Sequence, residues 1–119
     1  METIYEVYCD GSPTRLCVVV NGVLYIQDIF AENEVSIENV DEIEYAALKY
    51  ALELLPEGAS GIIYSDSQTI VSHMNSNYLI DQVKEPDHYL LKEMIKAKRL
   101  SLEVKWIPKK QNKAGKILG

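Results

Sequence analysis

The fold is decided by residues 4–29, which read IYEVYCDGSPTRLCVVVNGVLYIQDI. The first apolar run of this stretch stops at DGSP (residues 10–13), a cluster of turn formers that typically ends a strand. Two more runs, residues 16–20 and 23–29, flank Asn21-Gly22, a pair that tolerates the positive φ angles of a type I′ hairpin turn. The stretch therefore predicts three antiparallel strands in a meander.

A helix and a buried strand are predicted next. Asn39 and Glu42 form a capping-box pattern at the start of the helix. Apolar residues recur at helical spacing over residues 43–54, and Pro56 ends the helix. Residues 61–65 then form a short apolar run with β-branched members, which indicates a buried strand.

The rest of the chain continues this alternation. A short helix is expected over residues 67–74, and a second long helix is expected to begin at a cap formed by Asp87. Residues 102–106 alternate between apolar and polar side chains, as in a half-buried strand. A short terminal helix is expected from Gln111 onward.

This order, β-β-β-α-β-α-α-β-α, predicts an α/β fold. Its core is a five-stranded mixed sheet, an antiparallel meander followed by parallel strands, flanked by helices. The last two strands are reached through helices, so they are expected to lie parallel to the first strand. A chain of 119 residues fits one domain, residues 1–119, with one hydrophobic core.

Composition indicates a soluble globular protein, with 47% hydrophobic and 25% charged residues. No apolar run reaches the roughly 20 residues of a membrane span, so no membrane partner is expected. The start lacks the basic and then apolar pattern of a secretion signal, and a cytoplasmic location is expected. Cys9 and Cys17 are expected to be reduced core residues, with a disulfide or metal pair as the alternative. The sequence leaves the oligomeric state open.

Charge is segregated along the chain, although the net charge is −6. Residues 1–91 hold sixteen acids and three bases, whereas residues 92–119 hold two acids and nine bases. A basic segment of this kind can follow nucleic-acid phosphates while acids elsewhere hold a metal ion. The alternative is a solvated face with lysines, and charge alone does not separate the two.

Three acids are expected to meet at one edge of the sheet. Asp10 and Asp66 end the first and fourth strands, and α/β sheets bind ligands at the carboxyl ends of their strands. Glu44 lies in the first turns of the long helix. Neighbouring carboxylates repel one another, and a divalent cation such as Mg²⁺ or Mn²⁺ removes that repulsion. A single acid in such a place is more often a turn former or a helix cap, but three together require three coincidences.

The motifs around these acids resemble those of the type 1 ribonuclease H family. Four segments carry the likeness: YCDGS (residues 8–12), EYAAL (44–48), SDSQ (65–68), and WIP (106–108) with Asn112 and Ala114. They follow one another in the family's order over nearly the whole chain. Each motif is weak alone, and the ordered set is specific.

The resemblance implies an endonuclease that cleaves the RNA strand of RNA/DNA hybrids with two Mg²⁺ or Mn²⁺ ions. It implies that Asp10 bridges both ions, while Glu44 and Asp66 complete one metal site and position the attacking water. It also implies that Glu44 contacts a ribose 2′-hydroxyl, which distinguishes RNA from DNA. Substrate-binding residues are expected at Gly11, Ser12, Asn112, Lys109, Lys110 and Lys113.

The sequence departs from the family at the fourth acid, where Gly115 directly follows Ala114. One of the two ions is therefore expected to be weakly held and cleavage to be slowed, unless water or a nearby acid such as Glu85 or Asp87 replaces the ligand. The segment 75–86 also lacks the basic protrusion with which some members grip the hybrid. The C-terminal lysines are expected to take over part of that role.

Two other functions stay open. A catalytically silent module that binds hybrid or duplex nucleic acid would keep the fold and the basic segment after decay of the metal site. A protein-interaction domain without nucleic acid is disfavoured by the three motif-matched acids. Incubation with a labelled hybrid separates these readings, since an enzyme cuts it, a module only binds it and an interaction domain does neither.

Overall fold

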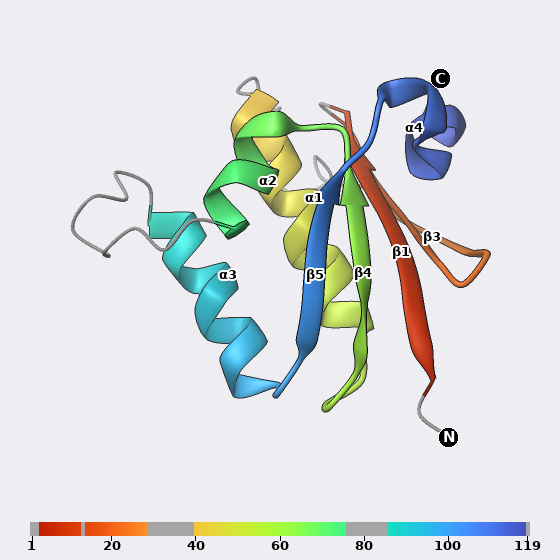
Figure 1. Ribbon diagram of the computed structural model, residues 1–119. Helices are drawn as coiled ribbons and strands as arrows, with labels where there is room; N and C mark the ends of the chain where they lie inside the picture. The colour runs from red at the N-terminus through yellow and green to blue at the C-terminus, as the bar shows by residue number, and fades with distance from the viewer. Residues whose placement is uncertain (1–2, 13, 29–39, 76–85, 119) are drawn as a thin grey trace.

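The computed structural model describes residues 3–12, 14–28, 40–75 and 86–118 (Figure 1). Its elements are β1 (Ile4–Gly11), β2 (Arg15–Val20), β3 (Val23–Asp28), α1 (Val40–Leu54), β4 (Ser60–Ser65), α2 (Gln68–Asn75), α3 (Pro86–Ala97), β5 (Ser101–Trp106), the 3₁₀ helix η2 (Lys109–Gln111) and α4 (Lys113–Leu118). This order confirms the one predicted from the sequence.

The five strands form one mixed sheet in the order β3-β2-β1-β4-β5. The pairs β1–β2 and β2–β3 are antiparallel, whereas β1–β4 and β4–β5 are parallel. The hairpin between β2 and β3 turns at Asn21 (φ 48°) and Gly22 (φ 83°), two positive angles in succession as a type I′ turn requires. The predicted fold class is therefore confirmed, with β1 and β4 in the interior of the sheet.

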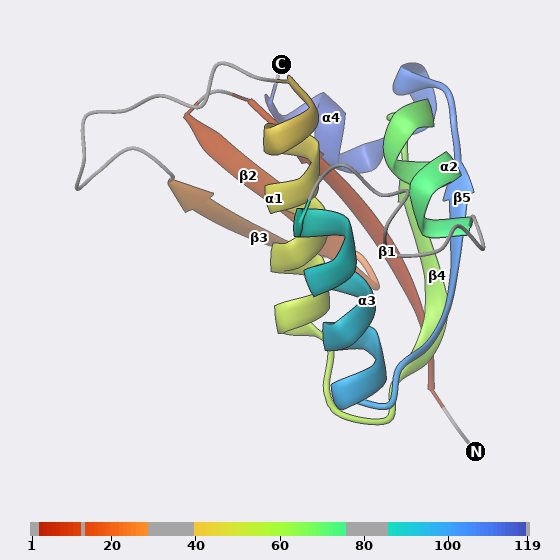
Figure 2. The same cartoon turned by 90° about the vertical axis from the view of Figure 1, so that its left-hand side faces the viewer.

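Helices cover the two faces of the sheet unequally. Helices α1, α2 and α3 lie on one face, with α1 and α3 side by side, and the short α4 lies on the other (Figures 1 and 2). Successive side chains of a strand point to opposite faces of the sheet, so β1 and β2 contribute core residues to both. Val7 and Val18 join the core under α1, while Cys17 packs with Ala114 of α4. Cys9 and Cys17 are buried and free, which confirms the expected core cysteines.

Two helix starts differ from their predictions. Helix α3 begins at Pro86, so Asp87 lies within the first turn instead of capping it. Proline suits this first position, because its fixed φ is helical and the missing N–H would have no partner there. The terminal helix does not begin at Gln111, because Asn112 adopts an extended conformation (φ −80°, ψ 107°) and separates η2 from α4. Asn39, the predicted cap of α1, lies outside the described residues.

Within the described ranges, no helix is long and apolar enough to cross a membrane.

Candidate metal centre

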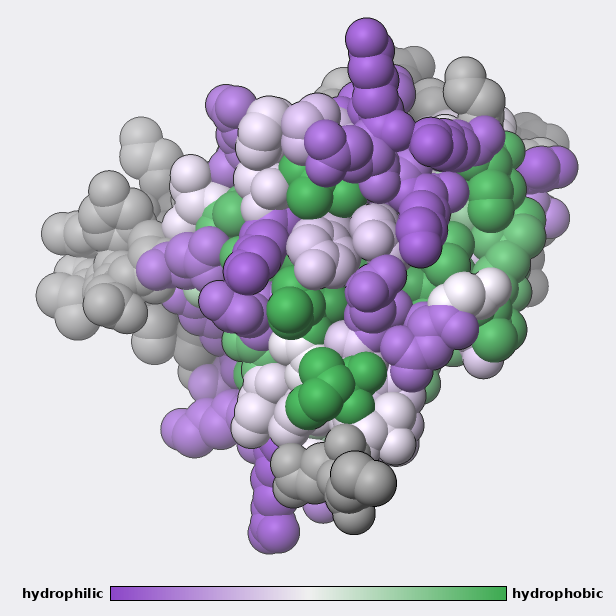
Figure 3. Space-filling view, turned by 45° about the vertical axis from the view of Figure 1, so that its right-hand side comes forward, coloured by the Kyte–Doolittle hydropathy of each residue, from purple (hydrophilic) through white to green (hydrophobic). Residues whose placement is uncertain are grey.

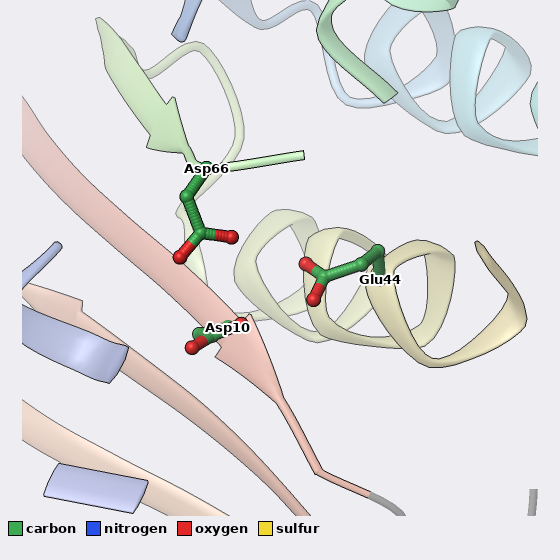
Figure 4. A group of neighbouring side chains, drawn as sticks. All are labelled: Asp10, Glu44 and Asp66. Atoms are coloured by element: carbon green, nitrogen blue, oxygen red, sulfur yellow. The ribbon is translucent and has the colours of Figure 1, made fainter. Parts of the chain in front are cut away.

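The carboxylates of Asp10, Glu44 and Asp66 converge beside the carboxyl ends of the central strands β1 and β4 (Figure 4). Each residue offers an oxygen, and these oxygens all lie within 4.8 Å of one another. Asp10 and Glu44 are only 6% and 7% exposed, and Asp66 is half-buried. The predicted convergence is thus present, and the cluster lies at the border between core and solvent.

Strand register explains why the two aspartates meet. The parallel strands β1 and β4 pair Tyr8 with Tyr64, whose rings stack at a centroid distance of 4.9 Å. Asp10 and Asp66 each lie two residues beyond this pair, so both point from the carboxyl ends of adjacent strands. Helix α1 crosses β1 and β2 and brings Glu44, near its N-terminal end, to the same place.

In the turn after β4, serine hydroxyls make the local hydrogen bonds, so the Asp66 carboxylate is available to the cluster. The Ser65 hydroxyl accepts the N–H of Ser67 at 3.1 Å, and the Ser67 hydroxyl accepts the N–H of Ile70 at 3.3 Å. Serine side chains therefore make the local turn and helix-cap bonds. The alternative in which Asp66 is only a helix cap does not describe this turn, because Ser67 has that role.

Burial and mutual repulsion govern the ionisation of the cluster. Burial, the charge of Asp10, a hydrogen bond with Asp10 and the charge of Asp66 raise the pKa of Glu44 to about 9, against a smaller lowering by Lys109. Burial and the charge of Asp10 also raise the pKa of Asp66, although the Asn112 amide and Lys109 oppose the rise. The cluster therefore concentrates more negative charge than its protein surroundings compensate.

The donor set fits a hard divalent cation. Buried Glu44 Oε2 has no hydrogen-bond partner, which is unusual for a buried polar atom. A cation beside it would satisfy this oxygen and offset the repulsion among the three carboxylates. Carboxylate oxygens are the ligands that Mg²⁺ and Mn²⁺ prefer. The cluster can therefore hold a divalent metal ion.

Asn112 supports the cluster from behind. Its side chain is fully buried, and its amide nitrogen donates to the Cys9 carbonyl at 3.0 Å and to Asp66 Oδ2 at 3.3 Å. Its amide oxygen accepts the N–H of Ala114 at 3.1 Å and so starts α4. Both polar atoms of the side chain are therefore hydrogen-bonded inside the protein, and its predicted contact with substrate stays a prediction. Asn112 positions Asp66 and joins β1 to α4.

Trp106 makes a second contact that the sequence did not indicate. Its ring N–H donates to the backbone carbonyl of Asp66 at 3.1 Å, while the residue stays 44% exposed. A tryptophan at the end of a strand gives no sequence signal for such a bond, since its partner lies 40 positions away along the chain. The contact fixes the backbone that carries Asp66.

Gly115 lies against the cluster, at the place where a fourth acid was expected. A Cβ atom added there would lie 2.8 Å from Asp10 Oδ2, closer than real Cβ contacts. Position 115 therefore faces the carboxylate cluster, and its glycine offers no ligand atom. The two acids expected to be substitutes, Glu85 and Asp87, have side chains outside those that the structure describes.

Gly11 and Ser12 have local tasks in the turn after β1. A Cβ at Gly11 would collide with the Ile43 side chain, so the glycine lets α1 approach the strand. The Ser12 hydroxyl accepts the N–H groups of Thr14 at 3.3 Å and Arg15 at 3.1 Å. Their predicted substrate contacts stay predictions, since the observed ones hold the turn beside Asp10 in shape.

The three C-terminal lysines expected to bind substrate occupy different surroundings. Lys109 lies near enough to lower the pKa values of Glu44 and Asp66 by its charge, and both Lys109 and Lys110 are exposed. Lys113 lies over the Tyr8 ring at 5.1 Å and pairs with Glu6 at 3.7 Å. Lys109 is thus the lysine of this group that acts on the carboxylate cluster.

Comparisons with known proteins identify structures with a similar fold. No protein-family model matches the chain, and no curated protein matches its sequence. Solved structures do match. LC11-RNase H1, isolated from compost by a metagenomic approach, aligns with a TM-score of 0.73 and 22% identity over 97% of this chain and 91% of that one. The same enzyme in complex with an RNA/DNA hybrid aligns with a TM-score of 0.70 and 19% identity, over 97% of this chain and 99% of that one.

An archaeal structure gives the same result. RNase H1 from Halobacterium salinarum NRC-1 aligns with a TM-score of 0.67 and 15% identity, over 98% of this chain and 94% of that one. At these identities the likeness concerns the fold, and it shows that the chain has the fold of type 1 ribonucleases H.

Proposed function

We propose that this protein is a metal-dependent endonuclease that cleaves the RNA strand of RNA/DNA hybrids. The observation that carries the proposal is the convergence of Asp10, Glu44 and Asp66 within 4.8 Å on a ribonuclease H fold, with Glu44 Oε2 left unpartnered. A structure that aligns over nearly the whole chain belongs to a ribonuclease H1 bound to such a hybrid. Neither observation alone names the reaction, but together they favour phosphodiester hydrolysis.

The residues divide the work according to their positions. Asp10 lies on β1 and Asp66 directly follows the adjacent strand β4, and both are proposed to hold the cation with Glu44. A divalent cation supplies activation of the attacking water and stabilises charge on the scissile phosphate. Glu44 is also proposed to contact the ribose 2′-hydroxyl, which selects RNA over DNA. Asn112 keeps the Asp66 carboxylate in place during this work.

Gly115 gives the proposed enzyme an uneven pair of metal positions. An ion between Asp10, Glu44 and Asp66 would have three protein carboxylates, whereas an ion next to Gly115 would have Asp10 and no ligand from α4. A second ion there would depend on water and on substrate phosphate for its other ligands. The loss of one well-placed charged ligand is proposed to slow the reaction by about 10²–10³-fold without abolishing it.

Hybrid binding is assigned to the basic C-terminal segment beside the cluster. Lys109 and Lys110 are exposed at η2, directly before the buried Asn112 that anchors this segment. Their charge can attract the phosphate backbone toward the carboxylates, in a manner that weakens with added salt. Lys113 is proposed to contribute less, because Glu6 already neutralises part of its charge.

The test is incubation of the purified protein with a hybrid whose RNA strand is labelled at its 5′ end, with Mg²⁺, with Mn²⁺ or with a chelator. Cleavage within the RNA strand is expected with either metal, with faster cleavage in Mn²⁺, and none with the chelator. RNA and DNA duplexes of the same sequence serve as substrate controls and should stay intact. The Asp10→Asn variant, prepared in parallel, excludes a contaminating nuclease.

The second candidate is a silent module that binds the hybrid, and Gly115 is the observation that favours it. The same preparations distinguish the two in a filter-binding or anisotropy assay. Binding of the intact hybrid with no cleavage in either metal would establish the module in place of the enzyme. Absence of both binding and cleavage would refute both candidates.

A further inference from the structure

The edge strand β3 exposes apolar side chains on both of its faces. Val23, Leu24, Tyr25 and Ile26 are 54%, 43%, 37% and 41% exposed. Hydrophobic side chains gather on the side of the molecule where β3 lies, at the right of Figure 3. Four consecutive exposed residues of this kind form an apolar strand edge, and this edge is far from the carboxylate cluster in sheet order.

The pattern of β3 is that of an interior strand. Leu24 and Ile26 pair with Val19 and Cys17 and so share the α4 face, whereas Tyr25 pairs with Val18 on the opposite face. Strands that are apolar on both faces are typically buried between neighbours, and edge strands usually carry charges, proline or a bulge. Residues 23–27 contain neither a charge nor a proline. Among the strands that the structure describes, β3 pairs only with β2, so its outer edge is a template for another strand.

The hairpin determines which backbone groups point outward. A two-residue turn closes on the hydrogen-bonded pair Val20–Val23, and pairs then alternate along the antiparallel ladder. The N–H and C=O groups of Val23 and Tyr25 therefore point to β2, while those of Leu24 and Ile26 point away from it. An added strand must form its hydrogen bonds with these two outward residues.

We propose that β3 pairs antiparallel with β3 of a second copy of this chain and joins the two sheets into one. A two-fold axis perpendicular to the sheet keeps each face continuous and places the two copies of Tyr25 opposite each other. Leu24 then exchanges hydrogen bonds with Ile26 of the other copy, twice by symmetry. Both faces of the new pair become apolar against apolar, which is the complementarity that β3 lacks within one chain.

Charge supports a second copy as the occupant. The uncharged residues 23–27 bring no like-charge pair into the contact, although the whole chain carries a net charge of −6. Asp28 lies outside the centred register and is already paired with Arg15 at 3.5 Å. A register centred on Ile26 would place Leu24 opposite Asp28 of the other copy, which is a poorer match. The same neutrality offers no attraction to a strongly charged peptide.

The contact is small, so the dimer is expected to be reversible. One strand pair with four half-exposed side chains on each copy falls below the roughly 1,200 Å² of standard interfaces. Sedimentation velocity should therefore show a dimer that grows with protein concentration. A chain that stays monomeric throughout the concentration series would overturn the proposal.

Disulfide trapping tests the register directly. In the proposed pair the two copies of residue 25 form a non-hydrogen-bonded pair with a Cα–Cα distance of about 4.5 Å, within the range that a disulfide spans. Tyr25→Cys should give a covalent dimer on mild oxidation. Val23→Cys, the matched control, should not, because its two copies lie about 14 Å apart along the strand. The native cysteines are buried and do not compete. Equal trapping of both variants would refute the register.

A charge placed on the outer edge gives an independent test. Ile26→Lys should abolish the concentration-dependent dimer, while Leu90→Lys, at a residue 56% exposed on α3, should keep it. Unchanged thermal melting of both variants verifies that they fold. A dimer that survives Ile26→Lys, or that Leu90→Lys removes, would place the contact elsewhere.

Discussion

The carboxylate cluster has two sides that differ in what they provide. On the α1 side, Glu44 is buried, and its Oε2 atom has no hydrogen-bond partner. On the α4 side, Asn112 makes three hydrogen bonds that support the site, but Gly115 provides no ligand. The α1 side therefore offers an unpartnered carboxylate oxygen to a cation, whereas the α4 side has supporting hydrogen bonds but no ligand atom at position 115.

The difference shows that the residues that hold Asp66 in position are distinct from those that would bind the metal ion. Asn112, directly before α4, is buried and donates to Asp66 Oδ2, so support for Asp66 is present on the side where position 115 provides no ligand. The contrast fits the proposed enzyme with one weak metal position, and the cleavage assay separates that enzyme from a silent module.

The largest effect is expected on the α1 side. Glu44→Gln keeps the shape of the side chain and removes a charged ligand, so hybrid cleavage should fall by at least about 100-fold. Glu53→Gln, at an exposed position on the same helix, is the matched control and should leave the rate unchanged. Initial rates on labelled hybrid measure the activity of both variants. Equal activity of the wild type and Glu44→Gln would show that Glu44 does not take part in cleavage.

A smaller effect is expected on the α4 side, where two substitutions at one position separate bulk from charge. Gly115→Ala adds the Cβ that crowds Asp10 Oδ2 and should lower the Mg²⁺-dependent rate. Gly115→Asp adds the same Cβ together with a carboxylate, and it should exceed the wild-type rate by about 10-fold or more. If the two variants have equal rates, position 115 does not contribute to metal binding.

The supporting bonds should matter for stability more than for chemistry. Asn112→Ala leaves the Cys9 carbonyl and the Ala114 N–H unpaired in the core, so the free energy of unfolding should fall by about 1–3 kcal/mol. Cleavage should also weaken by several-fold, because Asp66 loses its amide partner. Gln111→Ala, at the exposed neighbouring position, should change neither quantity. Urea unfolding provides the measurement, and a wild-type midpoint for Asn112→Ala would contradict the role of the side chain.

A pH dependence of stability is also expected from the α1 side. Burial and then the charge of Asp10 raise the pKa of Glu44 from 4.5 to about 9. Between these values the folded, metal-free protein holds a proton that the unfolded chain releases, so the free energy of unfolding falls as pH rises. Thermal melting without metal should therefore occur at a lower temperature at pH 8 than at pH 6.

Two comparisons assign this pH dependence to the cluster. Glu44→Gln mimics the protonated side chain and should flatten the dependence, whereas Glu53→Gln should keep it. Added Mg²⁺ or Mn²⁺ should raise the melting temperature more at pH 8, because the cation replaces the proton. A pH dependence that is the same in wild type and Glu44→Gln would mean that other groups produce it.

Local sequence patterns predicted the fold and the three acids because each depends on neighbouring residues. Strand ends, a type I′ turn and helical spacing are all visible within a few positions, and parallel register then brings Asp10 and Asp66 together. Asn112 could not be predicted in the same way, since its partners Cys9 and Asp66 lie 103 and 46 positions away. A buried amide and an exposed one look alike in sequence.

The lysines show a second limit of sequence reasoning. Charge counts grouped Lys109 and Lys113 in one basic segment, but the fold turns Lys113 toward Glu6 and Tyr8 on the sheet face. The exposure of β3 was likewise hidden, because an apolar strand is normally expected to be covered. Both features depend on which elements become neighbours, and this information lies outside any single motif.

A calorimetric titration of Mn²⁺ into the free protein tests the central claim most directly. One ion per wild-type chain is predicted, with binding lost in Asp10→Asn and a second ion gained in Gly115→Asp. Binding that Asp10→Asn leaves intact, or no binding to the wild type, would contradict a metal centre formed by Asp10, Glu44 and Asp66.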